Sequence, residues 1–157
     1  MEFFKQKVMA AQDECATHLK RMAYAYRNIS QFLPVDAQQL AQLNDEQIEA
    51  LDQYIYRFTK LQDAMGLRLF NHTLSLLAEN TREMPFIDKL NRLEQLGALE
   101  SAAQWLELRQ LRNLLAHEYA SDDQEKAAAI NLVFNHYPTM VEIMARFEAY
   151  LQKMARK

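Results

Sequence analysis

Glycine and proline are scarce in this chain of 157 residues, which contains two glycines and three prolines. Sheets joined by tight turns use these residues repeatedly, whereas long helices need them only near their ends. The abundant residue types, Leu, Ala, Gln and Glu, favour helices. The length is that of one domain with one continuous hydrophobic core. We therefore predict an all-α protein, with residues 1–157 forming a single domain.

Apolar residues recur at spacings of three and four, which is the pattern of helices that bury one face. The pattern predicts helices over residues 4–32, 44–80, 86–96, 101–115 and 122–151. Asn44 with Gln47 and Ser101 with Gln104 resemble capping boxes, Gly97 is a typical helix stop, and Pro138 should kink or break the last helix. Short connections between long helices favour an antiparallel bundle of about five helices. The sustained apolar faces also suit a helix-mediated dimer.

The composition suggests a cytoplasmic protein. A single cysteine, Cys15, rules out an internal disulfide and fits a reducing compartment. The N-terminal residues lack the pattern of a secretory signal, and no apolar stretch is long enough for a membrane span. The net charge of −3 argues against a general nucleic-acid coat protein, although a local basic cleft for RNA remains compatible with it.

The positions of the histidines, the cysteine and the glycines argue against a metal site and against a glycine-rich phosphate loop. His18 and His72 fall on apolar helix faces, where a histidine is usually a core or interface residue, and His136 has no spaced partner. No cysteine cluster or acidic set has metal-ligand spacing, so we expect no metal site. The only glycines are Gly66 and Gly97, which excludes a glycine-rich phosphate loop. We accordingly expect no cofactor.

One segment carries residues suited to chemistry: Arg112-Asn-Leu-Leu-Ala-His117-Glu-Tyr119. Cleavage of RNA without a metal needs a base for the 2′-hydroxyl proton and a cation for the charge that develops on the phosphate. Histidine titrates near neutrality, and arginine offers a permanent planar fork to phosphate oxygens. Arg112 and His117 are therefore sufficient in type for metal-independent RNA cleavage.

The spacing within this segment constrains its geometry. Five residues of an ideal helix leave Arg112 and His117 about 140° apart, whereas Tyr119 lies within about 20° of Arg112. His117 must therefore be brought round by the end of the helix or by a partner subunit. The competing interpretation is a plain helix end, with Arg112 and Glu118 solvated and His117 acting as a C-terminal cap.

Further polar residues are candidates for a supporting role. Arg109 lies one turn before the arginine of the segment and extends its cationic face. Arg57, Lys60 and Asp63 occupy two turns of the second predicted helix. We expect Lys60 and Asp63 to form an exposed ion pair of little energetic weight. If this helix faces the cleft, however, the three residues could orient RNA or hold the catalytic segment in place.

The segment resembles the motif of the HEPN family, and specifically of its HepT-like toxin branch, Arg-x-x-x-x-His-x-Tyr. Arg112, His117 and Tyr119 fit this motif, and Asn113 supplies the polar residue that commonly follows the arginine. The specific match covers only these eight residues. The resemblance implies a metal-independent endoribonuclease toxin of a toxin–antitoxin pair, acting as a homodimer whose two motifs face a shared cleft. It also implies a partner, a minimal nucleotidyltransferase antitoxin that binds the toxin and transfers AMP to Tyr119.

Two other functions are compatible with the sequence. The chain could be a non-catalytic accessory subunit that binds a nucleotidyltransferase and helps it to hold its substrate. It could also be a helical interaction module in which the motif occurs by coincidence. A neighbouring gene for a small nucleotidyltransferase would distinguish the first two functions from the third, and an RNA cleavage assay would distinguish the first from the second.

Overall fold

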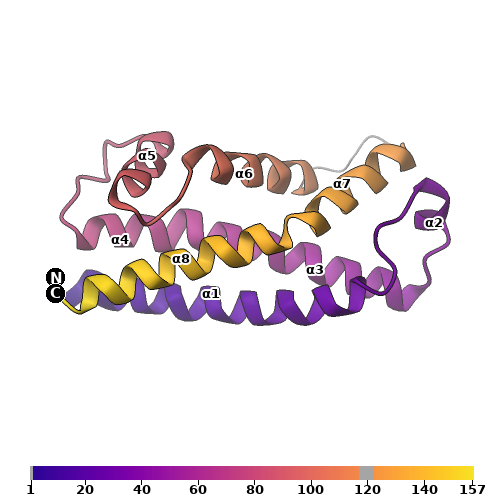
Figure 1. Ribbon diagram of the computed structural model, residues 1–157, viewed down its shortest axis with the longest axis horizontal. Helices are drawn as coiled ribbons and strands as arrows, with labels where there is room; N and C mark the ends of the chain where they lie inside the picture. The colour runs from indigo at the N-terminus through magenta and orange to yellow at the C-terminus, as the bar shows by residue number, and fades with distance from the viewer. Residues whose placement is uncertain (1, 117–121) are drawn as a thin grey trace.

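The computed structural model describes residues 2–116 and 122–157, and every regular element in this part of the chain is helical (Figure 1). The elements are α1 (Glu2–Ile29), α2 (Ala37–Ala41), α3 (Asp45–Asp63), the π-helical segment η1 (Ala64–Leu69), α4 (Phe70–Leu76), α5 (Phe86–Leu96), α6 (Ala102–Ala116), α7 (Asp123–Asn135) and α8 (Tyr137–Ala155). The predicted all-α fold class is confirmed. No helix among the described residues combines the length and the apolar character that a membrane crossing requires.

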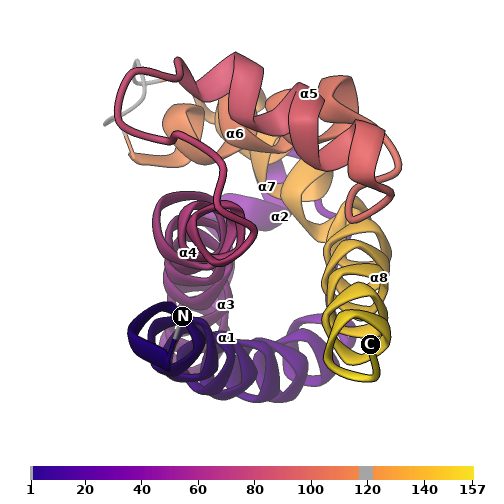
Figure 2. The same cartoon turned by 90° about the vertical axis from the view of Figure 1, so that its left-hand side faces the viewer.

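The long helices form an antiparallel bundle. The continuous rod of α3, η1 and α4 runs antiparallel to α1, and α6 runs antiparallel to α3 (Figure 1). Seen end-on, α1, the α3–α4 rod, the α5–α6 pair and α8 surround one interior (Figure 2). A hydrogen bond of 2.9 Å from Gln12 Nε2 to Glu148 Oε2 joins α1 to α8. The five predicted helical segments correspond to α1, the α3–α4 rod, α5, α6, and α7 together with α8.

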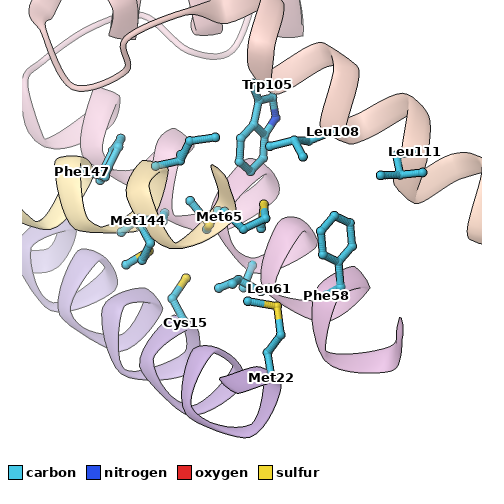
Figure 3. Close-up of a cluster of buried hydrophobic side chains, with 14 of the residues drawn as sticks. Cys15, Met22, Phe58, Leu61, Met65, Trp105, Leu108, Leu111, Met144 and Phe147 are labelled. Atoms are coloured by element: carbon cyan, nitrogen blue, oxygen red, sulfur yellow. The ribbon is translucent and has the colours of Figure 1, made fainter. Parts of the chain in front are cut away.

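The interior holds large apolar side chains from all of the long helices (Figure 3). Trp105 of α6 and Phe147 of α8 are fully buried. Each fully buried large apolar side chain stabilises the fold by about 1.5–3 kcal/mol. Cys15 lies in the same core, and burial raises the pKa of its thiol to about 12, so that it stays protonated. The best-buried large side chains are Trp105, Tyr54, Phe58, Phe70, Phe147, Met22, Ile29, Leu61, Met65, Leu69, Leu74 and Leu90.

Local sequence signals set most helix ends where they were expected. The side chains of Asn44 and Gln47 each accept the other residue's backbone N–H at 2.9 Å, which closes a capping box at the start of α3. Gly97 ends α5 in the left-handed conformation, with φ of +86°. Pro138 lies in the first turn of α8, and the predicted last helix breaks at His136.

The predicted second helix differs from the structure in one respect. It contains the π-helical segment η1, which uses more residues per turn than an α-helix and so rotates the chain beyond it. As a result the buried face of α4 consists of Phe70, Thr73 and Leu74, and His72, which was expected on the apolar face, is only half-buried. The short helix α2, which was not predicted, begins at its own capping box.

Candidate functional site

Helix α6 carries the start of the predicted catalytic segment, and its position depends on η1. The backbone N–H of Gln104 donates to Ser101 Oγ at 3.1 Å, which caps the first turn of α6. Trp105 then packs directly on Gly66. A Cβ atom at position 66 would come within 3.3 Å of the Trp105 ring, which is tighter than ordinary van der Waals contact. Glycine at position 66 therefore lets α6 lie close to the rod.

This close approach brings Arg112 of α6 against Asp63, the last residue of α3. Arg112 Nε donates to Asp63 Oδ1 and Arg112 Nη2 donates to Asp63 Oδ2, both at 3.0 Å. The two side chains are 27% and 24% exposed, so the pair lies at the edge of the core. The hydrogen bond to the carboxylate of Asp63 raises the pKa of Arg112. A two-pronged bond of this kind fixes both the position and the plane of the guanidinium group.

The pair leaves Arg112 with donors for a ligand. Among the described residues, Arg112 Nη1 has no hydrogen-bond partner, and the side chain keeps about a quarter of its surface exposed. An oriented guanidinium with an unused N–H edge is suited to binding one oxygen of a phosphate. The chemical capacity of the site is therefore recognition of an anion at a fixed position.

The prediction of an exposed ion pair between Lys60 and Asp63 is wrong. The carboxylate of Asp63 is taken by Arg112, because α6 packs across the end of α3. The ammonium group of Lys60 instead lies 5.6 Å from the centre of the Tyr56 ring. Of the two roles considered for Asp63, orienting RNA or holding the catalytic segment, its contact with Arg112 fits the second.

Arg57 and Arg109 do not join the Asp63–Arg112 pair. Arg57 points toward α1, where its Nη1 donates to His18 Nδ1 at 3.0 Å, and it also lies 5.3 Å from the Tyr56 ring centre. Arg109 lies over the ring of Phe86 in α5, with 4.6 Å from its Cζ to the ring centre. Asn113 is exposed on α6. Among the described residues, none of these three side chains forms a hydrogen bond or ion pair with Asp63 or Arg112.

His18 belongs to a second polar cluster between α1 and the rod. Its Nδ1 accepts from Arg57, so its Nε2 carries the proton and faces Glu14 Oε2 at 3.6 Å. Burial, followed by the charge of Arg57, lowers the pKa of His18, which keeps the ring neutral. Glu14 also accepts two bonds of 2.7 Å from Arg68 of η1. The prediction of His18 as a buried packing residue is therefore too simple, because it also accepts a bond from one of the candidate residues.

His117 and Tyr119 lie outside the described residues, so their predicted roles stay predictions. The structure follows the segment from Arg112 to the end of α6 at Ala116 and resumes at Asp122, whose side chain caps α7 by accepting the N–H of Gln124 at 2.9 Å. Within residues 2–116 and 122–157, no group of three or more His, Cys, Asp or Glu side chains is arranged to hold a metal ion.

The fold and this site define an all-helical bundle in which one helix presents an anchored arginine near its C-terminal end. Comparison with known families agrees with that class. The family model described as Ribonuclease HepT-like matches residues 44–147, from the cap of α3 into α8. The match covers well over half of the chain, which therefore belongs to the HepT-like ribonuclease family. No curated protein and no solved structure matches the chain.

Proposed function

We propose that this protein is a metal-independent endoribonuclease toxin in which Arg112 binds the scissile phosphate. The observation that carries the proposal is the two-pronged bond between Asp63 and Arg112, because it orients the arginine and, among the described residues, uses only its Nε and Nη2 groups. Membership of a ribonuclease family supports the choice of RNA as substrate. The mechanism and the biological pairing below go beyond that membership.

The proposed reaction needs only protein groups. His117 takes the proton of the 2′-hydroxyl, and the 2′-oxygen attacks the adjacent phosphorus. The bond from phosphorus to the 5′-oxygen breaks, and the leaving oxygen takes a proton from water or from the protonated histidine. The products carry a 2′,3′-cyclic phosphate and a 5′-hydroxyl. Arg112 stabilises the additional charge on the phosphate oxygens in the transition state.

The proposed active unit is a dimer. On an ideal helix Arg112 and a residue five positions later diverge by about 140°. The end of α6 at Ala116 is one way to bring the two together, and the proposal takes the other, in which two facing motifs complete one site. Light scattering at micromolar concentration should give about twice the chain mass of 18.4 kDa. A strict monomer would remove the shared cleft from the proposal.

The proposed partner is a minimal nucleotidyltransferase that modifies Tyr119. The phenol oxygen would attack the α-phosphorus of ATP and release pyrophosphate, leaving AMP on the tyrosine. The added negative charge would pair with Arg112, and the adenosine would obstruct the phosphate site. One modification would thereby block both binding and chemistry.

The decisive experiment compares RNA cleavage by purified wild-type protein with that of variants, in buffer containing EDTA. Arg112→Ala and His117→Ala should each abolish cleavage, and the wild-type products should carry the cyclic phosphate. Arg92→Ala is a matched control, because Arg92 forms a comparable pair with Glu79 at 2.8 Å from α5. It should keep full activity. Full activity in either motif variant would refute the catalytic assignment.

The accessory-subunit function remains the competing proposal, and one observation favours it. Asp63 neutralises much of the charge of Arg112, and the whole chain has a net charge of −3. Such a protein would have weak general attraction for RNA. If purified wild-type protein fails to cleave RNA and to arrest growth, yet binds a nucleotidyltransferase, the accessory function replaces the ribonuclease.

A further inference from the structure

Tyr56 is an exposed aromatic residue with two cations, Arg57 and Lys60, near its ring. Half of the residue is exposed, although it lies in the middle of α3. The guanidinium carbon of Arg57 lies 5.3 Å from the ring centre and the ammonium nitrogen of Lys60 lies 5.6 Å from it. A single exposed aromatic residue is ordinary on a protein surface. An aromatic ring with two flanking cations is the combination that single-stranded nucleic-acid sites use.

The position of this ring relates it to Arg112. Tyr56 and Asp63 are seven positions apart, so the two lie within about 20° of each other on α3 and about 10 Å apart along its axis. Lys60 lies between them, about 60° or less from that line. Asp63 in turn binds Arg112. Tyr56, Lys60 and the anchored Arg112 therefore follow one another along one face of the rod.

The direction of α6 relates its C-terminal end, at Ala116, to this line. Because α6 is antiparallel to α3, the residues that follow Arg112 along α6 advance toward the part of α3 that holds Lys60 and Tyr56 (Figure 1). A polynucleotide whose scissile phosphate lies at Arg112 would thus pass Lys60 and Tyr56 within about three nucleotides, at the roughly 3.4 Å per nucleotide of a duplex strand.

We infer that Tyr56 is a stacking platform for one nucleobase of a single-stranded RNA substrate, and that Lys60 binds the adjacent phosphate on the side that leads to Arg112. This inference rests on the proposed ribonuclease function and adds to it a subsite outside the family motif. On α3 the exposed acids Glu49 and Asp52 precede Tyr56, whereas the exposed cation Lys60 follows it toward the Asp63–Arg112 pair. A polyanion is therefore better accommodated on the side of Tyr56 that leads to Arg112.

The platform would supply affinity that Arg112 alone does not. Stacking of one base on an aromatic side chain contributes about 1–3 kcal/mol and tolerates different bases. Arg57 has one N–H bonded to His18 at 3.0 Å, which restrains its guanidinium beside the ring. The subsite should therefore favour an unpaired base over a base within a duplex, while discriminating little among the four bases.

The test measures binding of fluorescent single-stranded RNA by full-length His117→Ala protein, in which the RNA stays intact. Adding Tyr56→Ala should weaken binding about 5- to 100-fold, and adding Tyr56→Trp should preserve it. The matched control is Tyr24→Ala on α1, because Tyr24 is 59% exposed and has Arg27 at 5.8 Å from its ring. That control should bind like the parent protein.

A second measurement separates stacking from a general structural role. A set of RNAs, each lacking one base, should contain a position whose loss weakens binding to the parent protein and has no effect on Tyr56→Ala. If the parent binds RNA and Tyr56→Ala binds equally well, the subsite is refuted while the ribonuclease proposal stands. If the parent binds no RNA, both proposals fail. A change of oligomeric mass in Tyr56→Ala with unchanged RNA binding would assign the ring to a protein interface and overturn the inference.

Discussion

Removing either partner of the Asp63–Arg112 pair should destabilise the fold by about 1–2 kcal/mol, and the two losses should not add. Two charge-assisted bonds of 3.0 Å join the side chains. Bonds to charged groups contribute about 1.5–3 kcal/mol when buried, and exposed ion pairs contribute about 0–1 kcal/mol. With side chains 27% and 24% exposed, the pair falls between these limits. A double-mutant cycle should therefore give a coupling energy of about 1 kcal/mol.

The measurement is urea unfolding of wild type, Asp63→Ala, Arg112→Ala and the double variant, followed by circular dichroism at pH 7.5. The chain contains a useful reference pair, Glu14 with Arg68. Its bonds are shorter, at 2.7 Å, but its side chains are more exposed, at 35% and 42%.

If burial decides the energy of such pairs, the coupling of Glu14 with Arg68 should be the smaller one, below about 0.5–1 kcal/mol. A coupling energy near zero for Asp63 with Arg112 would contradict the inference that this partly buried pair stabilises the fold. A larger coupling for the reference pair would show that bond length outweighs burial.

Three further outcomes follow from the site. Asp63→Asn should lower kcat for RNA cleavage by roughly 100-fold, because Arg112 loses its anchor. KM should stay level or fall, because Arg112 regains its full charge. A raised KM with unchanged kcat would argue against a positioning role for Asp63. Tyr119→Phe should remain toxic and escape neutralisation by the nucleotidyltransferase, and mass spectrometry should find AMP on the wild-type peptide only; loss of toxicity together with stability would mark a structural tyrosine. The unfolding free energy should decrease as pH falls below about 6.5, because burial lowers the folded pKa of His18 and the unfolded chain then binds more protons. His18→Gln can still accept the bond from Arg57 and should show a shallower decrease between pH 7.5 and 5; an equal slope would exclude His18 as its source.

The helix ends were predictable because short sequence signals determine them. The caps at Asn44 and Ser101 and the stop at Gly97 act within one helical turn, so their residues can be recognised without knowledge of the rest of the chain. The break before Pro138 follows from the missing backbone donor of proline. The apolar spacing of three and four residues is also a local pattern, and it indicated helices that pack through one face into a bundle.

The π-helical segment could not be predicted in this way. Its glycine, Gly66, packs against Trp105, which lies 39 positions later in the sequence, and a local spacing rule contains no such long-range contact. The spacing rule assumed a uniform α-helix and therefore kept His72 on the buried face, whereas Phe70 and Leu74 occupy that face in the structure. A glycine inside an apolar helical pattern was the available signal, since it often marks a close approach.

The candidate site was predictable in residue type but not in its contacts. The sequence indicated Arg112 and Asp63 as separate candidates, and only the packing of α6 across α3 pairs them. Tyr56 was missed because an aromatic residue on a helix is ordinarily assigned to the core. Its relation to Arg57 and Lys60 was present in the spacing, one and four positions away, and its exposure was not.

The anchoring of Arg112 suggests how affinity and catalysis are divided within the proposed mechanism. An arginine whose charge is largely balanced by Asp63 attracts the single negative charge of a ground-state phosphodiester only weakly. The arginine stabilises the phosphate more strongly once a second negative charge develops on it, because the guanidinium group is already oriented and needs no reorganisation. Interactions that favour the transition state over the ground state raise kcat, so the anchor serves the reaction at the expense of binding. In the proposed mechanism binding must then come from groups whose charges are not balanced in this way, and Lys60 beside Tyr56 is such a group on the face of the rod that leads to Arg112.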